Sequence, residues 1–396
     1  MKIAILTSGI LPVPAVQGGA VENLIDFYLE YNQQHRLHDI TVYSVWHPDV
    51  EKNPAVTSDV NHYYYINTSC FGAKVFRRVH KLLHSNEYYN YFIEYFFEQV
   101  YKHLRKENYE YIVLENRPGY ACKLCQRGIS NLILHLHNDL LNSTSLHAMD
   151  IYQHLNKVIT VSDYIKQRVE TIPTQTDNKT ITVYNGINLQ NFTRRENPII
   201  NREKLGFRET DFVLVFSGRL NKDKGIDKLI EAMLLLTDLP NIKLMILGST
   251  FFGNASNEDS FVCSLKEKAL AIKERIVFTG FVPYQNMPDY LQLADIAIVP
   301  SVWDDPFPTT ILEAQAMGLP TIATNRGGIP EEVTDKSAII VPTEQNFVEG
   351  LANAIRRLFN TPKERSDMVI AAKHNAVKYN RERFARDFFN ALESKL

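Results

Sequence analysis

The sequence predicts an α/β protein of two domains, each a doubly wound parallel sheet. Short apolar runs, typical of buried parallel strands, alternate with amphipathic segments along most of the chain. The alternation stops near Asn185 and begins again at Val213. The 396 residues, with 45% hydrophobic side chains, suffice for two cores. We therefore expect two domains of similar size that face each other across a central cleft.

The predicted elements follow this division. The first series of strands is expected at residues 3–6, 40–45, 111–114, 132–136, 158–161 and 181–183, with helices at 21–31 and 163–171. The second series is expected at 213–216, 243–247, 276–279, 296–299, 321–323 and 339–341, with closing helices at 347–359, 362–379 and 383–396. The polar stretch 191–202 is interpreted as a linker. The expected domains are 1–190 and 196–379, with helix 380–396 packing back on the first.

Composition excludes several classes of protein. A formal net charge of −2 gives no electrostatic support for a nucleic-acid partner. No apolar run is long enough to cross a bilayer, and the chain starts directly as a strand, which favours a cytoplasmic protein. Four cysteines in so long a chain do not make a disulfide framework. Cys122 and Cys125 have redox spacing, but we interpret them as buried thiols on one helix face.

The segment 301–332 places two carboxylates, Asp305 and Glu313, eight positions apart between two expected strands. Asp305 lies just before a predicted helix, and Glu313 lies one turn inside it. Carboxylates accept hydrogen bonds from hydroxyl groups, and a helix start favours a phosphate. Together they suit a nucleotide-sugar, bound at the carboxyl ends of the strands. The neighbouring Asp304 could help to hold a magnesium ion, but a helix cap by one of the two acids is the preferred interpretation, and no metal or other cofactor is expected.

Two loops at strand ends add candidate phosphate contacts. Gly18 and Gly19 precede the first helix and would let the backbone approach a ligand, although a plain turn is an equal alternative. Gly218, Arg219 and Lys224 follow the first strand of the second domain. A guanidinium and an ammonium group in one loop suit a diphosphate, whereas a solvated charged loop is the alternative.

Histidines and a basic helix complete the candidate features. His135 and His137 end a predicted strand on the same side, with His135 packed inside and His137 facing the cleft. The segment 71–84 sets apolar against basic residues, as in a helix lying on an anionic membrane at the inner face, or as in an ordinary surface helix.

These motifs, in this order, resemble the retaining glycosyltransferases of family 4, which have the GT-B fold of two Rossmann-like domains. The resemblance spans essentially the whole chain. Its most specific part is the acid-x7-Glu segment, and Asn185-Gly186-Ile187-Asn188 and Gly327-Gly328-Ile329-Pro330-Glu331 also belong to it. It implies a metal-independent hexosyl transfer from a nucleotide-sugar, expected to be UDP-linked, to a hydroxyl of a glycan or lipid-linked acceptor in cell-surface polysaccharide synthesis.

The resemblance also implies residue roles. Arg219 and Lys224 would hold the diphosphate, Glu313 the ribose, Asp305 the transferred sugar, and His137 would face the reacting sugar. The implied donor-binding set includes in addition Gly18, Gly19, Gly218, Phe307, Thr309 and Thr310. Two departures, Asp305 in place of Glu and Pro308 in place of Gly, alter the expected sugar pocket. A sugar-nucleotide epimerase or hydrolase of the same fold, or a non-catalytic nucleotide-sugar-binding protein, are the alternatives.

Overall fold

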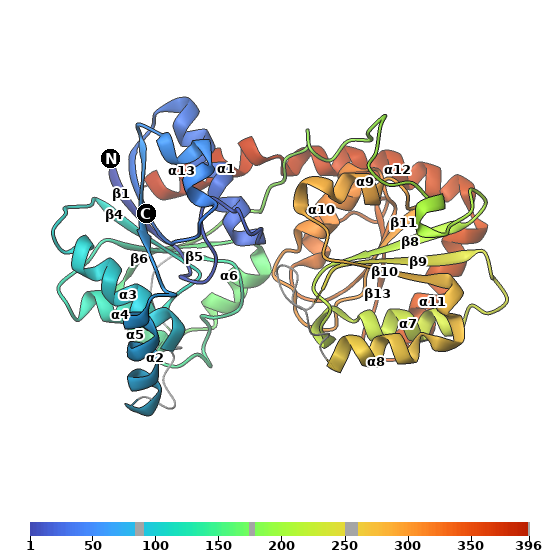
Figure 1. Ribbon diagram of the computed structural model, residues 1–396, viewed down its shortest axis with the longest axis horizontal. Helices are drawn as coiled ribbons and strands as arrows, with labels where there is room; N and C mark the ends of the chain where they lie inside the picture. The colour runs from blue at the N-terminus through green and yellow to red at the C-terminus, as the bar shows by residue number, and fades with distance from the viewer. Residues whose placement is uncertain (84–90, 174–178, 250–259, 395–396) are drawn as a thin grey trace. The chain divides into compact units, whose positions relative to one another are not determined.

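The computed structural model describes residues 1–83, 91–173, 179–249 and 260–394. The chain divides into two compact units, which are described separately (Figure 1). Unit 1 comprises Met1–Asn185 and Arg381–Leu396, and unit 2 comprises Gly186–Asn380. The chain leaves unit 1 directly after Asn185. It returns at Arg381.

Unit 1 is built on a parallel sheet of seven strands in the order β3-β2-β1-β4-β5-β6-β7. The strands are β1 Lys2–Leu6, β2 Asp39–Val45, β3 Asn61–Ile66, β4 Tyr111–Glu115, β5 Leu132–Leu136, β6 Leu155–Thr160 and β7 Thr180–Thr182. Six of them lie at the predicted positions. The edge strand β3 was missed, because its three tyrosines alternate between half-buried and exposed instead of forming a continuous apolar run.

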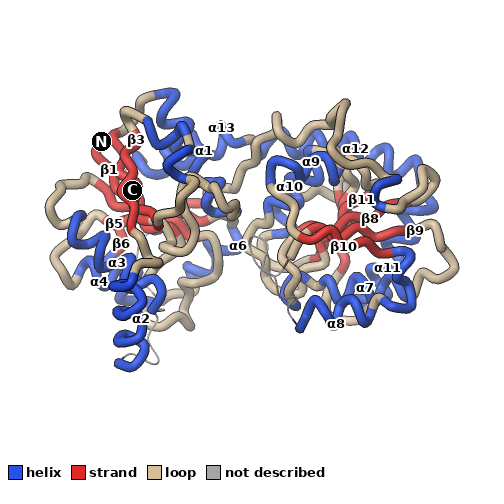
Figure 2. The backbone as a smooth tube through the Cα atoms, in the orientation of Figure 1, coloured by secondary structure: helices blue, strands red, loops and turns tan. Residues whose placement is uncertain are grey.

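The helices of unit 1 cover both faces of this sheet, as Figure 2 shows. They are α1 Ala20–His35, α2 Phe71–Leu83, α3 Tyr91–Leu104, α4 Gly119–Cys125, α5 Ala148–His154, α6 Asp163–Glu170 and the C-terminal α13 Arg381–Glu393. Helix α13 packs against α1, where the rings of Tyr28 and Phe388 stack with centroids 4.3 Å apart. The ammonium group of Lys157 donates to backbone carbonyls at the end of α13, including that of Leu392 at 3.0 Å. The last helix is therefore an integral part of the first core.

Unit 2 has a six-stranded parallel sheet in the order β10-β9-β8-β11-β12-β13. Its strands are β8 Phe212–Ser217, β9 Ile242–Leu247, β10 Ile276–Gly280, β11 Ile296–Val299, β12 Thr321–Thr324 and β13 Ala338–Val341, all at predicted positions. Its helices are α7 Ile226–Leu234, α8 Ser260–Lys268, α9 Met287–Leu291, α10 Thr309–Ala316, α11 Phe347–Asn360 and α12 Pro362–Ala376. Both units are therefore doubly wound, as the sequence predicted.

The stretch 191–202 contains no helix or strand, but the interpretation as a linker is wrong. Phe192 is almost completely buried. The Arg195 guanidinium donates to the Asp289 carboxylate at 2.6 Å, and the Arg195 backbone N–H donates to Gln292 Oε1 at 2.8 Å. These bonds fix the stretch to α9 as part of unit 2. A polar sequence signalled a loop, but it could not show that the loop is anchored.

Among the described residues, no helix combines the length and the apolar character that crossing a membrane requires.

Candidate active site

Both sheets have a point where the strand order reverses, and candidate residues of unit 2 follow the two strands at this point. In unit 2 the reversal falls between the neighbours β8 and β11, and in unit 1 it falls between β1 and β4. Ligands of open α/β sheets bind beyond the carboxyl ends of the strands at such a point. The loops that follow β8 and β11 carry Arg219, Lys224 and Asp305.

These two loops of unit 2 are joined through their backbones. The N–H of Val302 donates to the carbonyl of Asp223 at 2.9 Å. Gly225 follows the short 3-10 helix η4 Lys222–Lys224, and a Cβ added to it would lie 1.9 Å from the Pro300 carbonyl oxygen. Only glycine fits this close approach at its positive φ of 66°. The close approach of the two backbones therefore places Lys224 next to the loop after β11.

The ammonium group of Lys224 forms an ion pair and hydrogen bond with the carboxylate of Asp305. The Ser301 hydroxyl donates to the same carboxylate at 3.3 Å, and Asp305 is 4% exposed. The ring of Trp303 lies 5.7 Å from the ammonium nitrogen. Two residues predicted from separate motifs are thus direct partners.

The preferred interpretation of the acidic pair as a helix cap is wrong. The N-cap position of α10 is Pro308, which forms no side-chain cap hydrogen bond. Asp304 instead lies 3.0 Å from Arg326, and Asp305 faces Lys224. A third loop supports Asp305, since the N–H of Gly328 donates to its carbonyl at 2.8 Å.

Glu313 lies one turn inside α10, as predicted, and is 4% exposed. Burial raises the pKa of its carboxyl to about 7, although a hydrogen bond from Thr309 opposes this shift. Phe307 is buried next to Tyr379, with ring centroids 5.8 Å apart, and Thr310 is half-buried at the helix start. Because this pKa lies near neutral pH, a ligand whose hydroxyl groups donate hydrogen bonds to Glu313 would stabilise its ionised form.

The two remaining predicted residues of unit 2 lie in the loop directly after β8. The Gly218 backbone N–H donates to the Leu247 carbonyl at 3.0 Å. The Gly218 carbonyl oxygen lies close to Gly248, since a Cβ added to Gly248 would be 1.9 Å from that oxygen. Arg219 is exposed.

Sequence reasoning missed one buried acid of unit 2. Glu332 ends the 3-10 helix η7 Ile329–Glu332 with 0% exposure, and neither carboxylate oxygen has a hydrogen-bond partner among the described residues. Burial raises the pKa of its carboxyl well above the ordinary value, and Asp305 adds to the shift. Both effects favour the protonated, neutral form of this carboxyl group.

In unit 1, His135 and His137 meet at one carboxylate, that of Glu115 at the end of β4. Nε2 of His137 lies 2.8 Å from Glu115 Oε2, and Nδ1 of His135 lies 3.1 Å from the same oxygen. The Tyr28 hydroxyl donates to Oε1 at 2.9 Å. Both histidines lie on the same side of β5, and His135 is buried, as predicted. Sequence reasoning missed Glu115, although an acidic residue at the end of an apolar strand could have indicated it.

Charge in this cluster is set by burial and by the histidines. Burial opposes ionisation of Glu115, but attraction to His135 and His137 outweighs it and lowers the pKa to about 2. Burial, with His135, lowers the pKa of His137 to about 4, against the attraction of Glu115. At neutral pH we therefore expect an ionised Glu115 and a neutral His137. The Nε2–H of His137 then donates to the carboxylate and leaves Nδ1 as an acceptor.

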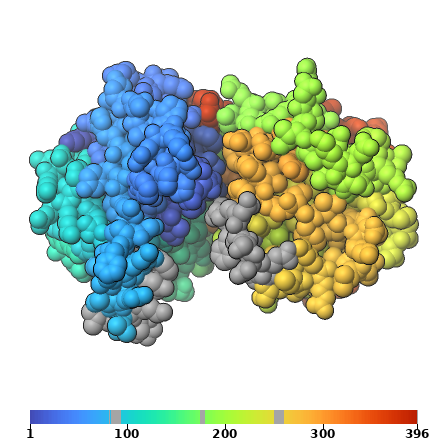
Figure 3. Space-filling model, viewed as in Figure 1, coloured from blue at the N-terminus to red at the C-terminus, as the bar shows by residue number. Residues whose placement is uncertain are grey.

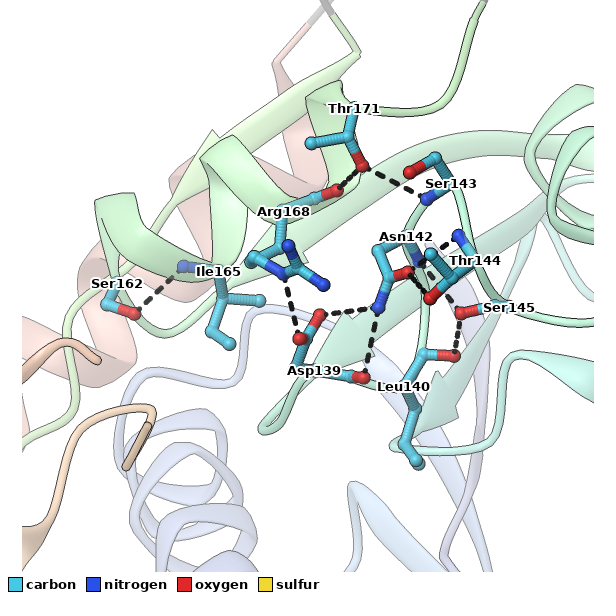
Figure 4. A network of polar contacts seen from close by, with 10 residues as sticks. All are labelled: Asp139, Leu140, Asn142, Ser143, Thr144, Ser145, Ser162, Ile165, Arg168 and Thr171. Carbon is cyan, nitrogen blue, oxygen red and sulfur yellow. Dashed lines mark hydrogen bonds and ion pairs between the residues drawn. The ribbon is translucent and has the colours of Figure 1, made fainter. Parts of the chain in front are cut away.

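The loop after β5 begins with His137, and side-chain hydrogen bonds hold the loop in place (Figure 4). Arg168 of α6 donates to Asp139 Oδ2 at 2.8 Å, and the Asn142 amide donates to Asp139 Oδ1 at 2.8 Å. Asn142 Oδ1 accepts from the Thr144 N–H at 2.8 Å, and Thr171 Oγ1 accepts from the Ser143 N–H at 3.0 Å. Helix α6 thus fixes the loop that carries His137.

Gly18 and Gly19 lead into α1 from the loop after β1. Gly19 has a φ of 112°, and a Cβ there would lie 2.1 Å from Glu22 Oε2. Glu22 is buried, and burial raises the pKa of its carboxyl to about 7. The positive φ therefore favours glycine at position 19 without any contact to a ligand.

Two groups of side chains among the described residues have the spacing of metal ligands, with ligand atoms within 4.8 Å of one another. One is Glu115, His135 and His137. The other is Cys122, Asp150 and His154, outside the predicted site. The first group is a hydrogen-bonded network in its own right, since Tyr28 and both histidines contact the carboxylate.

Comparison with known proteins agrees with this arrangement. Residues 199–375 match the model of the family Glycosyl transferases group 1. The chain is 30% identical over 372 residues to the putative glycosyltransferase YtcC of Bacillus subtilis, covering 91% of this chain and 83% of the relative. It is 28% identical over 361 residues to spore coat protein SA of the same organism, covering 87% of each.

Solved structures share the fold. Anabaena Alr3699/HepE, crystallised in complex with UDP, superposes with a TM-score of 0.75 at 20% identity over 100% of both chains. WaaG, a glycosyltransferase involved in lipopolysaccharide biosynthesis, superposes with a TM-score of 0.70 at 16% identity over 99% of this chain and 100% of its own. With two Rossmann-like units and a near full-length glycosyltransferase relative at 30% identity, the chain belongs to the glycosyl transferases group 1 family.

Proposed function

We propose that this protein is a retaining glycosyltransferase of the family 4 type that moves a sugar from a UDP-linked donor to an acceptor hydroxyl in cell-surface glycan synthesis. One observation carries the proposal: the loops after β8 and β11 meet at the strand-order reversal of unit 2 and pair Lys224 with Asp305. Glu313 lies one turn into the adjoining helix. Cationic groups and hydroxyl-accepting carboxylates on adjoining elements suit a ligand that carries both phosphates and sugars.

The donor is assigned to unit 2. Lys224 and Arg219 hold the diphosphate, and Glu313 accepts hydrogen bonds from the ribose hydroxyls. Asp305 has two roles: it orients Lys224 through the ion pair, and its carboxylate accepts from the transferred sugar. The backbone of Gly218 and the α10 start at Phe307, Thr309 and Thr310 complete the donor-binding set.

In unit 1, His137 contacts the reacting sugar, and Glu115 is its positioning residue. The ionised Glu115 fixes the ring and its tautomer through Nε2. This leaves Nδ1, a buried atom with no partner among the described residues, to accept a sugar hydroxyl. Gly18 and Gly19 contact the phosphates or the acceptor through their backbone.

Catalysis in this proposal is chiefly electrostatic. As the bond between the sugar and the diphosphate breaks, negative charge grows on the leaving group. Lys224 and Arg219 offset that charge, which lowers the barrier because the stabilisation is greater in the transition state than in the ground state. No protein nucleophile is assigned. The acceptor hydroxyl attacks the face of the sugar from which the diphosphate departs, and its proton passes to the departing phosphate oxygen.

The choice of donor and acceptor rests on relatives. Alr3699/HepE has been crystallised with UDP and with UDP-glucose, and its fold matches this chain. A lipopolysaccharide 1,2-N-acetylglucosaminetransferase of Salmonella typhimurium is 28% identical over 269 residues. The first supports a UDP-linked donor, and the second supports a surface glycan as the acceptor.

A panel of nucleotide-sugars tests the proposal. UDP-sugars are expected to raise the melting temperature of the wild type but not of Glu313→Ala, because the ribose contact is lost. Transfer to an acceptor glycan is expected with retained anomeric configuration, measured by NMR, and is expected to persist in excess EDTA. Donor turnover that never requires an acceptor would instead indicate a hydrolase or epimerase. Activity lost in EDTA and restored by magnesium or manganese would contradict metal independence and make Asp304 and Asp305 the candidate ligands.

We further propose that α2 contacts an anionic membrane surface. Phe71, Val75, Val79 and Leu82 follow one another at helical spacing and are 82%, 43%, 50% and 85% exposed. Lys74 and Arg78 are exposed between them. The opposite side of α2 packs on α3, where Phe76 meets Tyr95 with ring centroids 5.7 Å apart. Figure 3 shows the α2 segment projecting from unit 1. The predicted member His84 lies outside the described residues.

Vesicle sedimentation checks this contact. The wild type is expected to co-sediment with phosphatidylglycerol vesicles and to dissociate at high salt, because exposed charges are screened. The variant Phe71→Ser/Leu82→Ser should bind at least ~10-fold more weakly, since two apolar side chains no longer insert. Ile370→Ser is the matched control, because Ile370 is 70% exposed on α12 of unit 2. Equal binding of wild type and double variant would contradict the proposal.

A further inference from the structure

A cluster of metal-ligand side chains lies between α4 and α5 of unit 1. These two helices pack against each other. Cys122 of α4 donates its thiol hydrogen to Asp150 Oδ2 of α5 at 3.2 Å. His154 Nδ1 lies 3.3 Å from Asp150 Oδ1, and the three ligand atoms all lie within 4.8 Å of one another. The interpretation of Cys122 as a buried thiol is therefore wrong: it is half-buried and has a polar partner.

The geometry is close to that of a zinc site. Zinc is bound by thiolate, imidazole and carboxylate at roughly 2.0–2.3 Å, so neighbouring ligand atoms of a tetrahedral site lie roughly 3.3–3.8 Å apart. The Cys122 sulfur lies 3.2 Å from Asp150 Oδ2 and His154 Nδ1 lies 3.3 Å from Asp150 Oδ1, so both separations are close to this spacing, although they involve different oxygens of the carboxylate. The Asp150 backbone carbonyl accepts a hydrogen bond from His154 Nδ1 at 2.6 Å. Zinc would replace this hydrogen bond, with the ring proton on Nε2.

We infer that Cys122, Asp150 and His154 form a zinc-binding site that ties α4 to α5. Binding converts the Cys122 thiol to a thiolate and releases its proton to solvent. The His154 ring exchanges its Nδ1 proton for one on Nε2, so that the Zn–S, Zn–N and Zn–O bonds can form. The charges of the thiolate and the Asp150 carboxylate then balance the 2+ charge of the ion. This site is separate from the proposed transfer site and does not depend on the proposed function.

The test is a zinc titration of the full-length protein, stripped of metal and kept reduced, in competition with a chromophoric chelator. We expect one zinc ion per chain. Cys122→Ser and His154→Ala should each lower the affinity on the order of 100-fold or more, since second-shell changes alone cost 10- to 100-fold. The matched control is Cys263→Ser, which replaces a cysteine of unit 2 and should bind zinc like the wild type.

Cobalt supplies a second readout, because its charge-transfer band reports directly on a thiolate ligand. The cobalt-loaded wild type and Cys263→Ser should show a thiolate-to-cobalt charge-transfer band, which Cys122→Ser should lose. The exposed Asp150 allows a third variant, Asp150→Asn, that leaves packing intact. Unchanged zinc affinity in Cys122→Ser, the absence of stoichiometric binding, or cobalt binding without the band would each overturn the inference. So would a Cys122–Cys125 disulfide that forms equally fast with and without zinc.

Discussion

Replacing Lys224 with Ala is expected to cause two separable losses, one in nucleoside diphosphate affinity and one in the stability of unit 2. A charge-assisted hydrogen bond contributes roughly 1.5–3 kcal/mol, so UDP should bind roughly 10- to 150-fold more weakly. The exposed Lys222 of the same short helix gives the matched control, Lys222→Ala, which should bind UDP normally. Calorimetry measures both affinities.

The loss of stability follows from the partner that Lys224 leaves behind. Asp305 is 4% exposed, and without Lys224 only the Ser301 hydroxyl at 3.3 Å would remain among its recorded side-chain partners. Removing one member of a buried ion pair costs roughly 3–5 kcal/mol, and because the Lys224 side chain is 21% exposed we expect about 2–3 kcal/mol. The double variant Lys224→Ala/Asp305→Asn should recover much of this stability but none of the UDP affinity.

Unfolding of unit 2 can be followed by itself. The chain has two tryptophans, Trp46 in unit 1 and Trp303 beside Lys224 in unit 2. In a Trp46→Phe background, tryptophan fluorescence in urea reports unit 2 alone. Wild-type UDP affinity in both Lys224→Ala and Arg219→Ala would refute the diphosphate assignment, whatever the stability.

The strands and the positions of Asp305 and Glu313 could be predicted because both depend on local pattern. An apolar run of four to six residues flanked by loops indicates a buried strand, and helix α10 begins where its sequence suggests. The edge strand β3 escaped the same reasoning, because only part of it is buried.

The parts of the site that the sequence did not predict depend on contacts between segments far apart in the chain. Glu115 meets His135 only because β4 lies beside β5 in the sheet, with these two residues in register. Neither the strand order nor the register can be predicted from the sequence of β4 or of β5 alone. Lys224 and Asp305 are 81 residues apart, and their pairing depends on β8 lying beside β11. Cys122 and Asp150 likewise meet through the packing of α4 on α5.

The second large effect is expected at Glu115 and His137. His137→Ala should lower the transfer rate on the order of 100-fold while UDP affinity stays unchanged, because the lost contact concerns the reacting sugar and not the nucleotide. Glu115→Gln keeps the volume of the side chain but removes the charge that orients His137, so it should lower the rate in the same way. His62→Ala, at an exposed histidine of β3, is the control.

These two residues should also make unit 1 sensitive to acid. The pKa of His137 is lowered from 6.5 to about 4, so the unfolded chain binds its proton first and stability falls as the pH drops from about 6.5 to about 4. The pKa of Glu115 is lowered from 4.5 to about 2, so its contribution is present above about pH 4.5 and is lost between there and about pH 2. In a Trp303→Phe background, urea unfolding followed through Trp46 measures unit 1. His137→Ala should flatten the upper part of the pH profile, and Glu115→Gln the lower part. If His137→Ala kept both full turnover and the wild-type acid profile, His137 would be an ordinary structural histidine.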